Sequence, residues 1–287
     1  MERHIVVITA DERQKKLLAL LEGAKACSSW EEYVGKDLAC ERIYVLPIPI
    51  TKLDKNPLLK EKLKQELINV QKQGVIYLKV FGGVFTSEWR SFLEENKIPY
   101  WDFMDLPEVV EGNAWITAEA TIAEVLQLAD YSICGQRILV TGYGCCGEKI
   151  AKLFARLGAK VIVVARRAEV RVAARKDGFV AIGFEDMPQV LSDVSAVINT
   201  VPSMVVTEAC IRQMQHDSLI VDIASKPGGT DFDAAKRYGI KAKLALGLPG
   251  IYTTSSSALL LKNAILKYAP LQENVSEDKS WIFQIII

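Results

Sequence analysis

A short glycine-rich segment near the middle of the chain has the spacing of a dinucleotide-binding turn. It reads G-x-G-x-x-G, with Gly142, Gly144 and Gly147 at the glycine positions and Cys145 and Cys146 between the last two. The first glycine permits a tight turn after a strand, the second lets the backbone approach a pyrophosphate, and the third lets helix and strand pack closely. Amides at the start of the next helix bind the phosphates. A strand pattern precedes the motif and a helical pattern follows it, so a dinucleotide site is favoured over a plain turn.

The residues about 20 positions beyond the motif determine which dinucleotide fits. In NAD-binding versions of this turn, an acidic residue at the end of the second strand takes the ribose 2′-hydroxyl. This chain has Arg166 and Arg167 there, and two guanidiniums can bind a 2′-phosphate. The sequence therefore favours NADP. NAD stays the alternative because Glu169 lies close enough to reach the ribose, which would leave both arginines as solvated loop charges.

Two later segments place polar residues after predicted strands, at the edge where open α/β sheets bind ligands. We predict that Asn199, Thr200, Val201 and Pro202 contact the nicotinamide half of the cofactor. We also predict that Lys226, beside Pro227-Gly228-Gly229, holds a substrate carboxylate. Turn capping or an exposed charge is an equally good interpretation of each residue.

The catalytic group is harder to place because both histidines, His4 and His216, are interpreted as surface residues. Glu119 and Lys226 are the candidate catalytic residues. We expect Glu119 in the first turn of a helix, where a carboxylate interacts favourably with the helix dipole, and that structural role is the favoured one. Substrate contacts are predicted from four residues: Asn113, Thr117, Lys226 and Ser256.

The six cysteines of the chain include no C-x-x-C pair and have no nearby histidine that would complete a zinc site. No metal site is therefore predicted, and the cysteines are interpreted as reduced thiols of a cytoplasmic protein. Neighbouring cysteines rarely pair without backbone strain. We therefore interpret Cys145 and Cys146 as small turn residues rather than as a redox pair.

Composition narrows the kind of partner. The 287 residues include 35 Lys plus Arg and 35 Asp plus Glu, so no excess positive field would hold nucleic acid or an anionic membrane surface. The apolar runs are too short to span a bilayer, and the run after His4 is too short for a signal peptide. The apolar segment 281–287 is expected to pack on a partner or a sheet edge. A small molecule or a protein is the expected partner.

The first half of the chain alternates short apolar segments with amphipathic ones. Strands are predicted at 5–8, 43–48, 75–81 and 99–103, and helices at 11–21 and 58–71. Pro57 suits a first helical turn and Gly74 suits a C-cap. A helix from Thr117 to Ala129 then connects this half to the second.

The second half predicts six parallel strands, the number that the classic dinucleotide fold needs. They lie at 137–141, 160–165, 180–183, 194–199, 219–223 and 242–246, with a helix at 148–157 and a final one at 256–267. The predicted fold is α/β with two domains, a flavodoxin-like domain and a Rossmann domain. We expect an N-terminal domain at 1–112, a connector helix at 113–134, the Rossmann domain at 135–252, and a C-terminal helix and tail at 253–287.

Together these segments resemble the A subunit of the bacterial dipicolinate synthase family. The resemblance extends over nearly the whole chain, with weaker similarity at Asp11 to Gln14 and at Asn113, Thr117 and Glu119. Its most specific segments are 198–204, 222–232 and 247–251.

The resemblance implies an oxidoreductase of sporulation that works with a flavoprotein-like B subunit. Such an enzyme converts dihydrodipicolinate to dipicolinate, a small dicarboxylate, with NADP as acceptor. The sequence departs from the family pattern in three places: Ile116 stands where proline is usual, Ala120 replaces a glycine, and 253–258 lacks a Pro-Lys-Thr-Ala-Gly-like segment. Substrate identity is therefore a weaker expectation than cofactor binding.

Two other functions fit the same two-domain plan. An NAD(P)-dependent 2-hydroxy or 2-amino acid dehydrogenase usually supplies a histidine-based acid–base pair, which we cannot place in this chain. A non-catalytic NADP(H)-binding subunit would only regulate or scaffold its partner. Each of these functions, including that of a dipicolinate synthase subunit, is compatible with a homo-oligomer.

Overall fold

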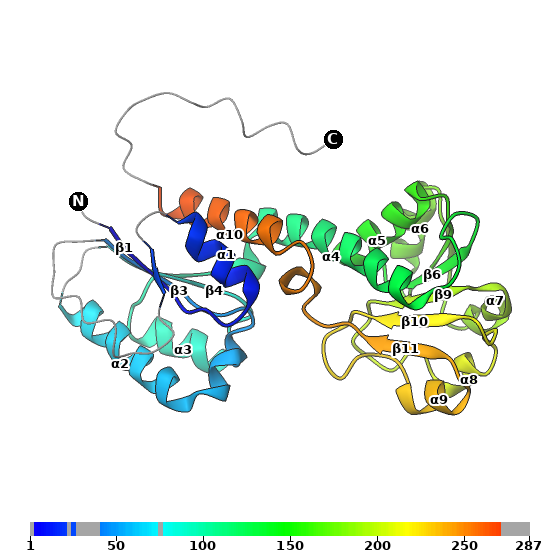
Figure 1. Ribbon diagram of the computed structural model, residues 1–287, viewed down its shortest axis with the longest axis horizontal. Coiled ribbons are helices and arrows are strands. Elements are labelled where there is room, and N and C mark those ends of the chain that lie inside the picture. The colour runs from blue at the N-terminus through cyan, green and yellow to red at the C-terminus, as the bar shows by residue number, and fades with distance from the viewer. Residues whose placement is uncertain (1–2, 22–23, 27–40, 74–76, 271–287) are drawn as a thin grey trace, which may run out of the picture.

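The chain forms two lobes, each built around a parallel sheet, as the computed structural model in Figure 1 shows. The structure describes residues 3–21, 24–26, 41–73 and 77–270. The predicted C-cap at Gly74 and the apolar segment 281–287 lie outside these residues. No helix within them is both long enough and apolar enough to cross a membrane.

The first lobe has a five-stranded parallel sheet in the order β2-β1-β3-β4-β5. This is the flavodoxin-like strand order, so the predicted fold class is confirmed for this lobe. The two-residue strand β2 was not predicted, because so short a segment has no recognisable alternation. The strands are β1 (Arg3–Val7), β2 (Lys25–Ala26), β3 (Glu41–Val45), β4 (Leu78–Gly82) and β5 (Tyr100–Asp102).

Helices cover both faces of this sheet. On one face α2 (Pro57–Lys72) and α3 (Ser87–Glu95) enclose a core that includes Tyr44 and Trp89. On the other face α1 (Glu12–Leu20) packs beside α10 (Thr254–Tyr268), the last described helix of the chain. The C-terminal helix therefore returns to the first lobe, which sequence alone could not determine. The short helices η2 (Ile50–Lys55) and η3 (Phe103–Asp105) follow β3 and β5.

The second lobe has a six-stranded parallel sheet in the order β11-β10-β9-β6-β7-β8. Counted from β6, this is the classic Rossmann order 3-2-1-4-5-6 read from the other edge, so the predicted Rossmann domain is confirmed. The strands are β6 (Arg137–Thr141), β7 (Lys160–Val164), β8 (Val180–Ile182), β9 (Ala196–Asn199), β10 (Leu219–Asp222) and β11 (Lys241–Leu244).

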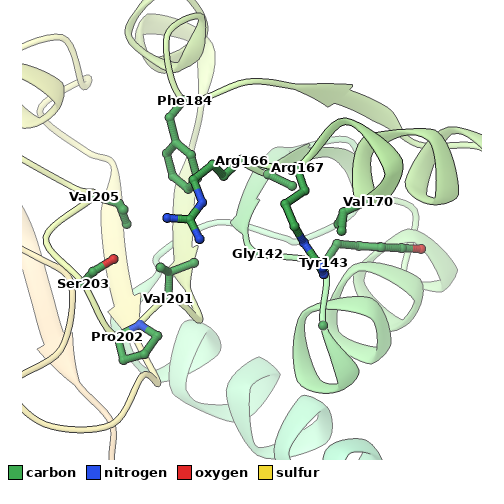
Figure 2. Close-up of a pocket in the computed structure, with 12 residues that line it drawn as sticks. Gly142, Tyr143, Arg166, Arg167, Val170, Phe184, Val201, Pro202, Ser203 and Val205 are labelled. Atoms are coloured by element: carbon green, nitrogen blue, oxygen red, sulfur yellow. The ribbon is translucent and has the colours of Figure 1, made fainter.

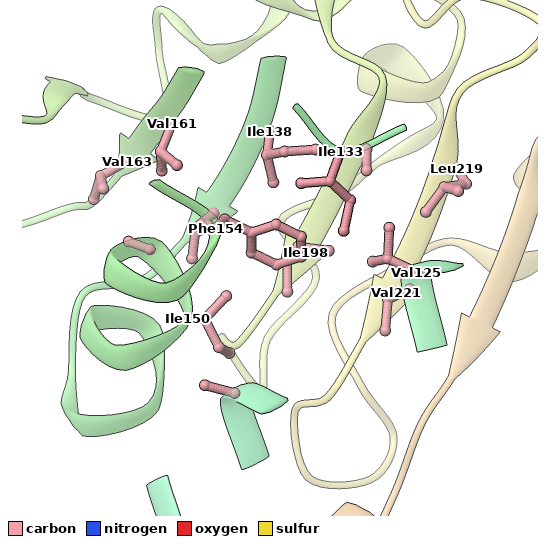
Figure 3. Packing of buried hydrophobic residues seen from close by; sticks show 14 of the residues in the cluster. Val125, Ile133, Ile138, Ile150, Phe154, Val161, Val163, Ile198, Leu219 and Val221 are labelled. Carbon is pink, nitrogen blue, oxygen red and sulfur yellow. The ribbon is translucent and has the colours of Figure 1, made fainter. Parts of the chain in front are cut away.

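The helix α5 (Cys145–Arg156) packs on this sheet through Ile150 and Phe154, both fully buried (Figure 3). It begins earlier than the predicted start at Glu148, because the amides of the glycine turn already belong to its first turn. The other helices of the lobe are short and lie between successive strands. They are α6 (Ala168–Lys176), α7 (Met187–Val190), η4 (Leu191–Asp193), α8 (Glu208–Ile211), α9 (Phe232–Arg237) and, after β11, η5 (Leu248–Gly250).

The connector between the lobes is α4 (Pro107–Leu128), which runs from one lobe to the other in Figure 1. The predicted start of this helix was wrong, since it begins at Pro107, well before Asn113 or Thr117. Consequently Glu119 lies in the middle of α4, and the predicted first-turn interaction with the helix dipole was also wrong. Val109 belongs to the core of the first lobe and Val125 to that of the second.

Candidate dinucleotide-binding site

The three motif glycines adopt the geometry that a dinucleotide turn requires. Gly142 has φ +83°, a conformation that side-chain-bearing residues rarely adopt. A Cβ atom on Gly147 would lie 2.4 Å from the carbonyl oxygen of Gly142, so only glycine lets α5 pack this closely on the turn. At Gly144 no atom outside the two adjacent residues lies within 4 Å of the Cβ position. The second glycine therefore faces open space, as the approach of a pyrophosphate would need.

Hydrogen bonds hold this turn against the neighbouring strands. The amide of Gly142 donates to the carbonyl of Val164 at 2.8 Å. Thr200 donates its hydroxyl to the carbonyl of Thr141 at 2.7 Å, and its Oγ1 lies only 2.5 Å from the Cβ position of Gly142. Thr200 therefore fills the space that a side chain at the first glycine would occupy.

A pocket of about 430 Å³ opens beside the turn (Figure 2). Its walls come from the turn itself, the loop after β7, the start of α6, the residue after β8, and the segment after β9. These contribute Gly142 to Gly144, Ala165 to Arg167, Val170, Phe184, Val201 to Ser203, and Val205. The structure thus brings together the glycine turn, both predicted arginines and two residues of the 199–202 segment.

The two predicted arginines are exposed at the rim of this pocket, and Figure 2 shows both side chains beside it. Arg167 Nε lies 3.5 Å from Glu169 Oε1, and both side chains are about 70 % exposed. Such a surface ion pair is worth little, so Arg167 can exchange Glu169 for a phosphate. Among the described residues, Arg166 has no ion-pair partner and Arg167 has none besides Glu169.

Arg171 was missed by sequence reasoning although it shapes this loop. Its Nη1 donates to the carbonyl oxygens of Ala165 at 2.8 Å and of Arg166 at 2.7 Å. The guanidinium therefore fixes the backbone that carries Arg166 and Arg167. No feature of the sequence separates this arginine from its neighbours, because the contact depends on how α6 leaves the loop.

Tyr143 anchors the turn from the side. Its hydroxyl donates to Asp177 Oδ2 at 2.6 Å, and its ring meets Phe179 edge to face with centroids 5.9 Å apart. Burial and the neighbouring Asp177 carboxylate raise the pKa of Tyr143. The phenol therefore stays protonated and keeps donating this hydrogen bond.

Cys145 and Cys146 lie in the first turn of α5, where their backbone amides belong to the phosphate-binding end of the helix. Burial raises the pKa of both thiols, that of Cys146 to about 11. Cys145 Sγ lies 3.8 Å from the carbonyl of Val110 in α4. These are protonated packing thiols, which supports their interpretation as small turn residues.

We expected Asn199 to contact the nicotinamide directly, but its side chain is engaged in hydrogen bonds within the turn. Its side chain is fully buried and accepts hydrogen bonds from the hydroxyl of Thr141 and, at 3.1 Å, from the amide of Val201. It also donates to the carbonyl of Val201 at 3.0 Å. The Asn199 side chain therefore shapes the turn, and Val201 and Pro202 are the residues of this segment that reach the pocket.

A buried carboxylate supports the loop that carries Lys226. Asp222 accepts hydrogen bonds from the amide of Gly229 at 2.8 Å and from the hydroxyl of Thr230 at 2.7 Å. Gly229 in turn packs against the 201–203 backbone, where a Cβ would lie 2.4 Å from the carbonyl of Val201. Lys226 itself is exposed and has no hydrogen-bond or ion-pair partner among the described residues. It does not line the pocket beside the glycine turn.

The predicted substrate residues of α4 are in different environments. Thr117 is 7 % exposed and donates its hydroxyl to the carbonyl of Asn113 at 2.7 Å, so this side chain is engaged within the helix. Asn113 is half-buried and Glu119 is exposed.

Ser256 is exposed in the first turn of α10, whose N-cap Thr253 makes no side-chain capping bond. The amides of that turn are therefore available to an anion.

Neither histidine lies near the pocket. His216 precedes β10, at the amino-terminal edge of the sheet, opposite the glycine turn, and its Nε2 lies 3.4 Å from the Cβ position of Gly239. His4 lies within β1 of the first lobe and is half-buried rather than fully exposed. In the described part of the chain, no group of three or more His, Cys, Asp or Glu side chains is arranged to hold a metal ion.

Comparisons with known proteins agree with a nicotinamide-binding domain. Residues 105–225 match the family model of the D-isomer specific 2-hydroxyacid dehydrogenase NAD binding domain. The A subunit of dipicolinate synthase from Bacillus subtilis (strain 168) is 34% identical over 188 residues, which are 66% of this chain and 63% of the relative. Adenosylhomocysteinase of Pyrococcus abyssi is 27% identical over 121 residues, 42% of this chain and 27% of that protein. The aligned region thus spans less than two thirds of either curated relative.

Solved structures extend the similarity to the first lobe. The A subunit of dipicolinate synthase from Bacillus halodurans superposes with a TM-score of 0.76 at 26% identity, covering 93% of this chain and 97% of that one. The predicted resemblance to the A subunit of dipicolinate synthase is confirmed. The A chain of dipicolinate synthase from Bacillus subtilis gives a TM-score of 0.74 at 25% identity, covering 93% and 96%. A transhydrogenase from Sinorhizobium meliloti, at 14% identity and a TM-score of 0.60 over 92% of both chains, shares the fold.

The dehydrogenase domain and the glycine turn together establish a domain of the nicotinamide-binding type.

The open space at Gly144 generates a direct test. Gly144→Val should weaken NADP binding at least about a hundredfold, because the side chain would occupy the space of the pyrophosphate. Titration calorimetry measures the change. The thermal midpoint should stay close to that of the wild type, since a Cβ at this position has no neighbour within 4 Å outside the adjacent residues of the chain. Unchanged NADP affinity would show that the turn is only structural.

Cysteine reactivity should follow the raised pKa of the turn thiols. With a pKa of about 11, roughly one Cys146 thiol in a thousand is ionised at pH 8. Alkylation by iodoacetamide should therefore be slow at pH 8 and accelerate as the pH rises towards that pKa. Peptide mapping by mass spectrometry measures the rate, with the exposed Cys134 as the internal control. Faster modification of Cys146 than of Cys134 at pH 8 would contradict the packing role.

Proposed function

We propose that the chain is an NADP-dependent oxidoreductase of the dipicolinate synthase type, which acts in the cytoplasm during sporulation. Its substrate would be dihydrodipicolinate and its product dipicolinate, with a flavoprotein-like B subunit as partner. The observation that carries the cofactor assignment is the pair of exposed arginines at the rim of the pocket, after β7. The dipicolinate synthase relatives support the substrate assignment.

The proposed reaction needs little from a protein base. Bound NADP would accept a hydride, and loss of a proton from the dihydropyridine completes an aromatic ring, so the driving force is internal to the substrate. Positioning by the protein should therefore dominate. This suits a chain whose two histidines lie away from the pocket.

The residues at the carboxyl ends of β9 and β10 would do the positioning. The 199–202 turn would present the nicotinamide, through Val201 and Pro202, with Asn199 holding their backbone. Lys226 has an uncommitted ammonium after β10, and we propose that it binds one substrate carboxylate. The exposed first turn of α10 at Ser256 is a second set of donors. Glu119 and Asn113 of α4 remain proposed contacts.

A 2-hydroxyacid dehydrogenase is the second candidate, because the family model of residues 105–225 carries that description. Oxidation of a hydroxyl needs a base to take its proton, and no histidine lies at the pocket to supply it. A non-catalytic NADP(H)-binding subunit is the third.

Assays of the purified chain, alone and with a flavoprotein partner, separate these functions. NADPH should form with dihydrodipicolinate and not with 2-hydroxy acids, and the reverse result would favour the dehydrogenase.

Cofactor choice should depend on the two arginines. The double change Arg166→Ala plus Arg167→Ala should weaken NADP binding roughly tenfold to a hundredfold while leaving NAD binding within about twofold. The reason is that only NADP has the 2′-phosphate that these guanidiniums would bind. Fluorescence titration with both dinucleotides measures the two constants. Arg212→Ala, at another exposed arginine of the same lobe, is the matched control. An unchanged NADP constant in the double variant would refute the assignment.

Substrate binding should depend on Lys226. Lys226→Met removes the charge and keeps much of the side-chain volume, so KM for the dicarboxylate should rise by about one to two decades while NADP binding persists. Steady-state kinetics and NADP titration measure both effects. Lys236→Met, an exposed lysine of α9, is the control. If Lys226→Met leaves the substrate kinetics unchanged, Lys226 is only a loop charge.

A further inference from the structure

A second charged cluster lies in the first lobe, where β1 and β3 end. Asp11 follows β1 and caps α1 by accepting the amide of Gln14 at 3.0 Å. Arg13 belongs to the first turn of α1, and Lys52 to η2 after β3. Asp11 Oδ2 accepts from Lys52 Nζ at 2.6 Å and from Arg13 Nη2 at 3.4 Å. Two cations therefore share one carboxylate oxygen.

The positive charge of this cluster is only partly compensated. Asp11 is the one carboxylate among the described residues that acts on Arg13, and its short contact goes to Lys52. Arg13 is 6 % exposed, and its Nε has no hydrogen-bond partner in the part of the chain that the structure describes. A buried donor or charge without a partner is costly unless a ligand supplies one. The cluster therefore has the excess positive charge and the unpartnered donor that an anion-binding site needs.

Titration properties agree with this charge balance. Burial lowers the pKa of Arg13, and the neighbouring Asp11 offsets only part of the effect. Burial acts to raise the pKa of Asp11. The hydrogen bond from Lys52, the charge of Arg13, the amide of Gln14 and the charge of Lys52 together outweigh it, so the pKa is lowered. Asp11 is therefore ionised at neutral pH and already counted in the balance of two positive charges against one negative charge.

The surrounding backbone holds the cluster in place before any ligand binds. Gln14 accepts the amide of Ala10 at 2.8 Å and donates to the carbonyl of Leu46 at 3.0 Å, which fixes the first turn of α1 to the ends of β1 and β3. Arg13 Nη2 also donates to the carbonyl of Ile48 at 3.3 Å. A preorganised site loses less entropy on binding.

The cluster meets the second lobe at the carboxyl end of its sheet. Asp11 Oδ2 lies 3.5 Å from the Cβ position of Gly250, the last residue of η5. The helix η5 follows β11, and the chain continues from it into α10. Figure 1 shows this orange segment between the two lobes, beside α1. The ends of β1 and β3 in one lobe therefore adjoin the loop that ends the other sheet.

We propose that Lys52 and Arg13 form a carboxylate-binding site of the first lobe, which holds one carboxylate of a small dicarboxylate ligand. This inference rests on the proposed function, because it places the ligand between this cluster and the carboxyl ends of the Rossmann strands. Lys226 would take the other carboxylate. A dicarboxylate can then link both lobes, whereas a monocarboxylate satisfies only one cation site. The cluster thereby determines specificity for two acidic groups.

The test is titration calorimetry of dipicolinate, in metal-free buffer, into the full chain saturated with NADP. Lys52→Met should weaken dipicolinate binding roughly tenfold to a hundredfold and leave the NADP constant unchanged. Lys55→Met is the matched control, because Lys55 lies exposed in the same short helix. Since Lys52 is partly exposed, its loss should not unfold the chain, and the thermal midpoint checks this.

A second variant has the opposite expected sign. Asp11→Asn keeps an oxygen that can cap α1 but removes the carboxylate that competes for Lys52 and Arg13, so dipicolinate should bind about threefold tighter or more. A merely structural ion cluster would not give tighter binding when its carboxylate is lost. Equal dipicolinate affinity in the wild type and Lys52→Met, or weaker binding by Asp11→Asn, would overturn the proposal.

Failure of this inference can be distinguished from failure of the proposed function. If dihydrodipicolinate is turned over and Lys52→Met leaves KM unchanged, only the carboxylate site is wrong. If no turnover occurs with any partner, yet dipicolinate binding depends on Lys52 and not on Lys55, the site stands and the proposed reaction fails. Wild-type protein that binds no dipicolinate in the presence of NADP would contradict the site.

Discussion

The structure depends on one helix that is buried by both lobes. α4 contributes Val109 to the core around β1 and β4, and Ala118 and Val125 to the core around β6 and β10. Separating α4 from either lobe would expose apolar side chains that now pack on a sheet. Its buried Glu124 also pairs with Lys243 of β11, which ties the far edge of the Rossmann sheet to the same helix. Because α10 packs on α4 as well, the loop from β11 to α10 is held beside the first lobe.

Sequence reasoning predicted the parts of this fold that rest on local patterns. Buried parallel strands appear as short apolar runs, so both sheets could be anticipated, and the glycine motif lay between a recognisable strand and helix. The start of α4 was missed because Val109, Ala114 and Ile116 lie on more than one face of the helix, and a helix buried on several sides has no amphipathic period. The engaged side chains of Asn199 and Thr117 could not be anticipated either, since their partners depend on tertiary contacts or on where the helix begins. The cluster of Asp11 and Lys52 could not be predicted for the same reason, because the contact joins residues far apart in the sequence.

The departures from the family pattern at Ile116 and Ala120 have a physical explanation in α4. Both residues lie inside this helix and are buried, at 9 % and 1 % exposure. A proline at 116 would remove a helical hydrogen bond and kink the helix. A glycine at 120 would cost about 1 kcal/mol relative to alanine in a helix interior. Both residues therefore favour a continuous α4.

The charge distribution agrees with the proposed recognition of anionic ligands by a chain of zero net charge. Overall neutrality removes long-range attraction, so recognition must come from cations placed at short range. The two sets differ in environment: Arg166 and Arg167 are exposed at the rim of the pocket, whereas Arg13 is buried and Lys52 is partly covered. Salt screens exposed charges far more than buried ones. In the proposed function, the rim arginines would hold the cofactor through contacts that salt weakens strongly. The enclosed cluster, whose donors are fixed by Gln14 and the strand ends, suits discrimination between ligands that differ by one carboxylate.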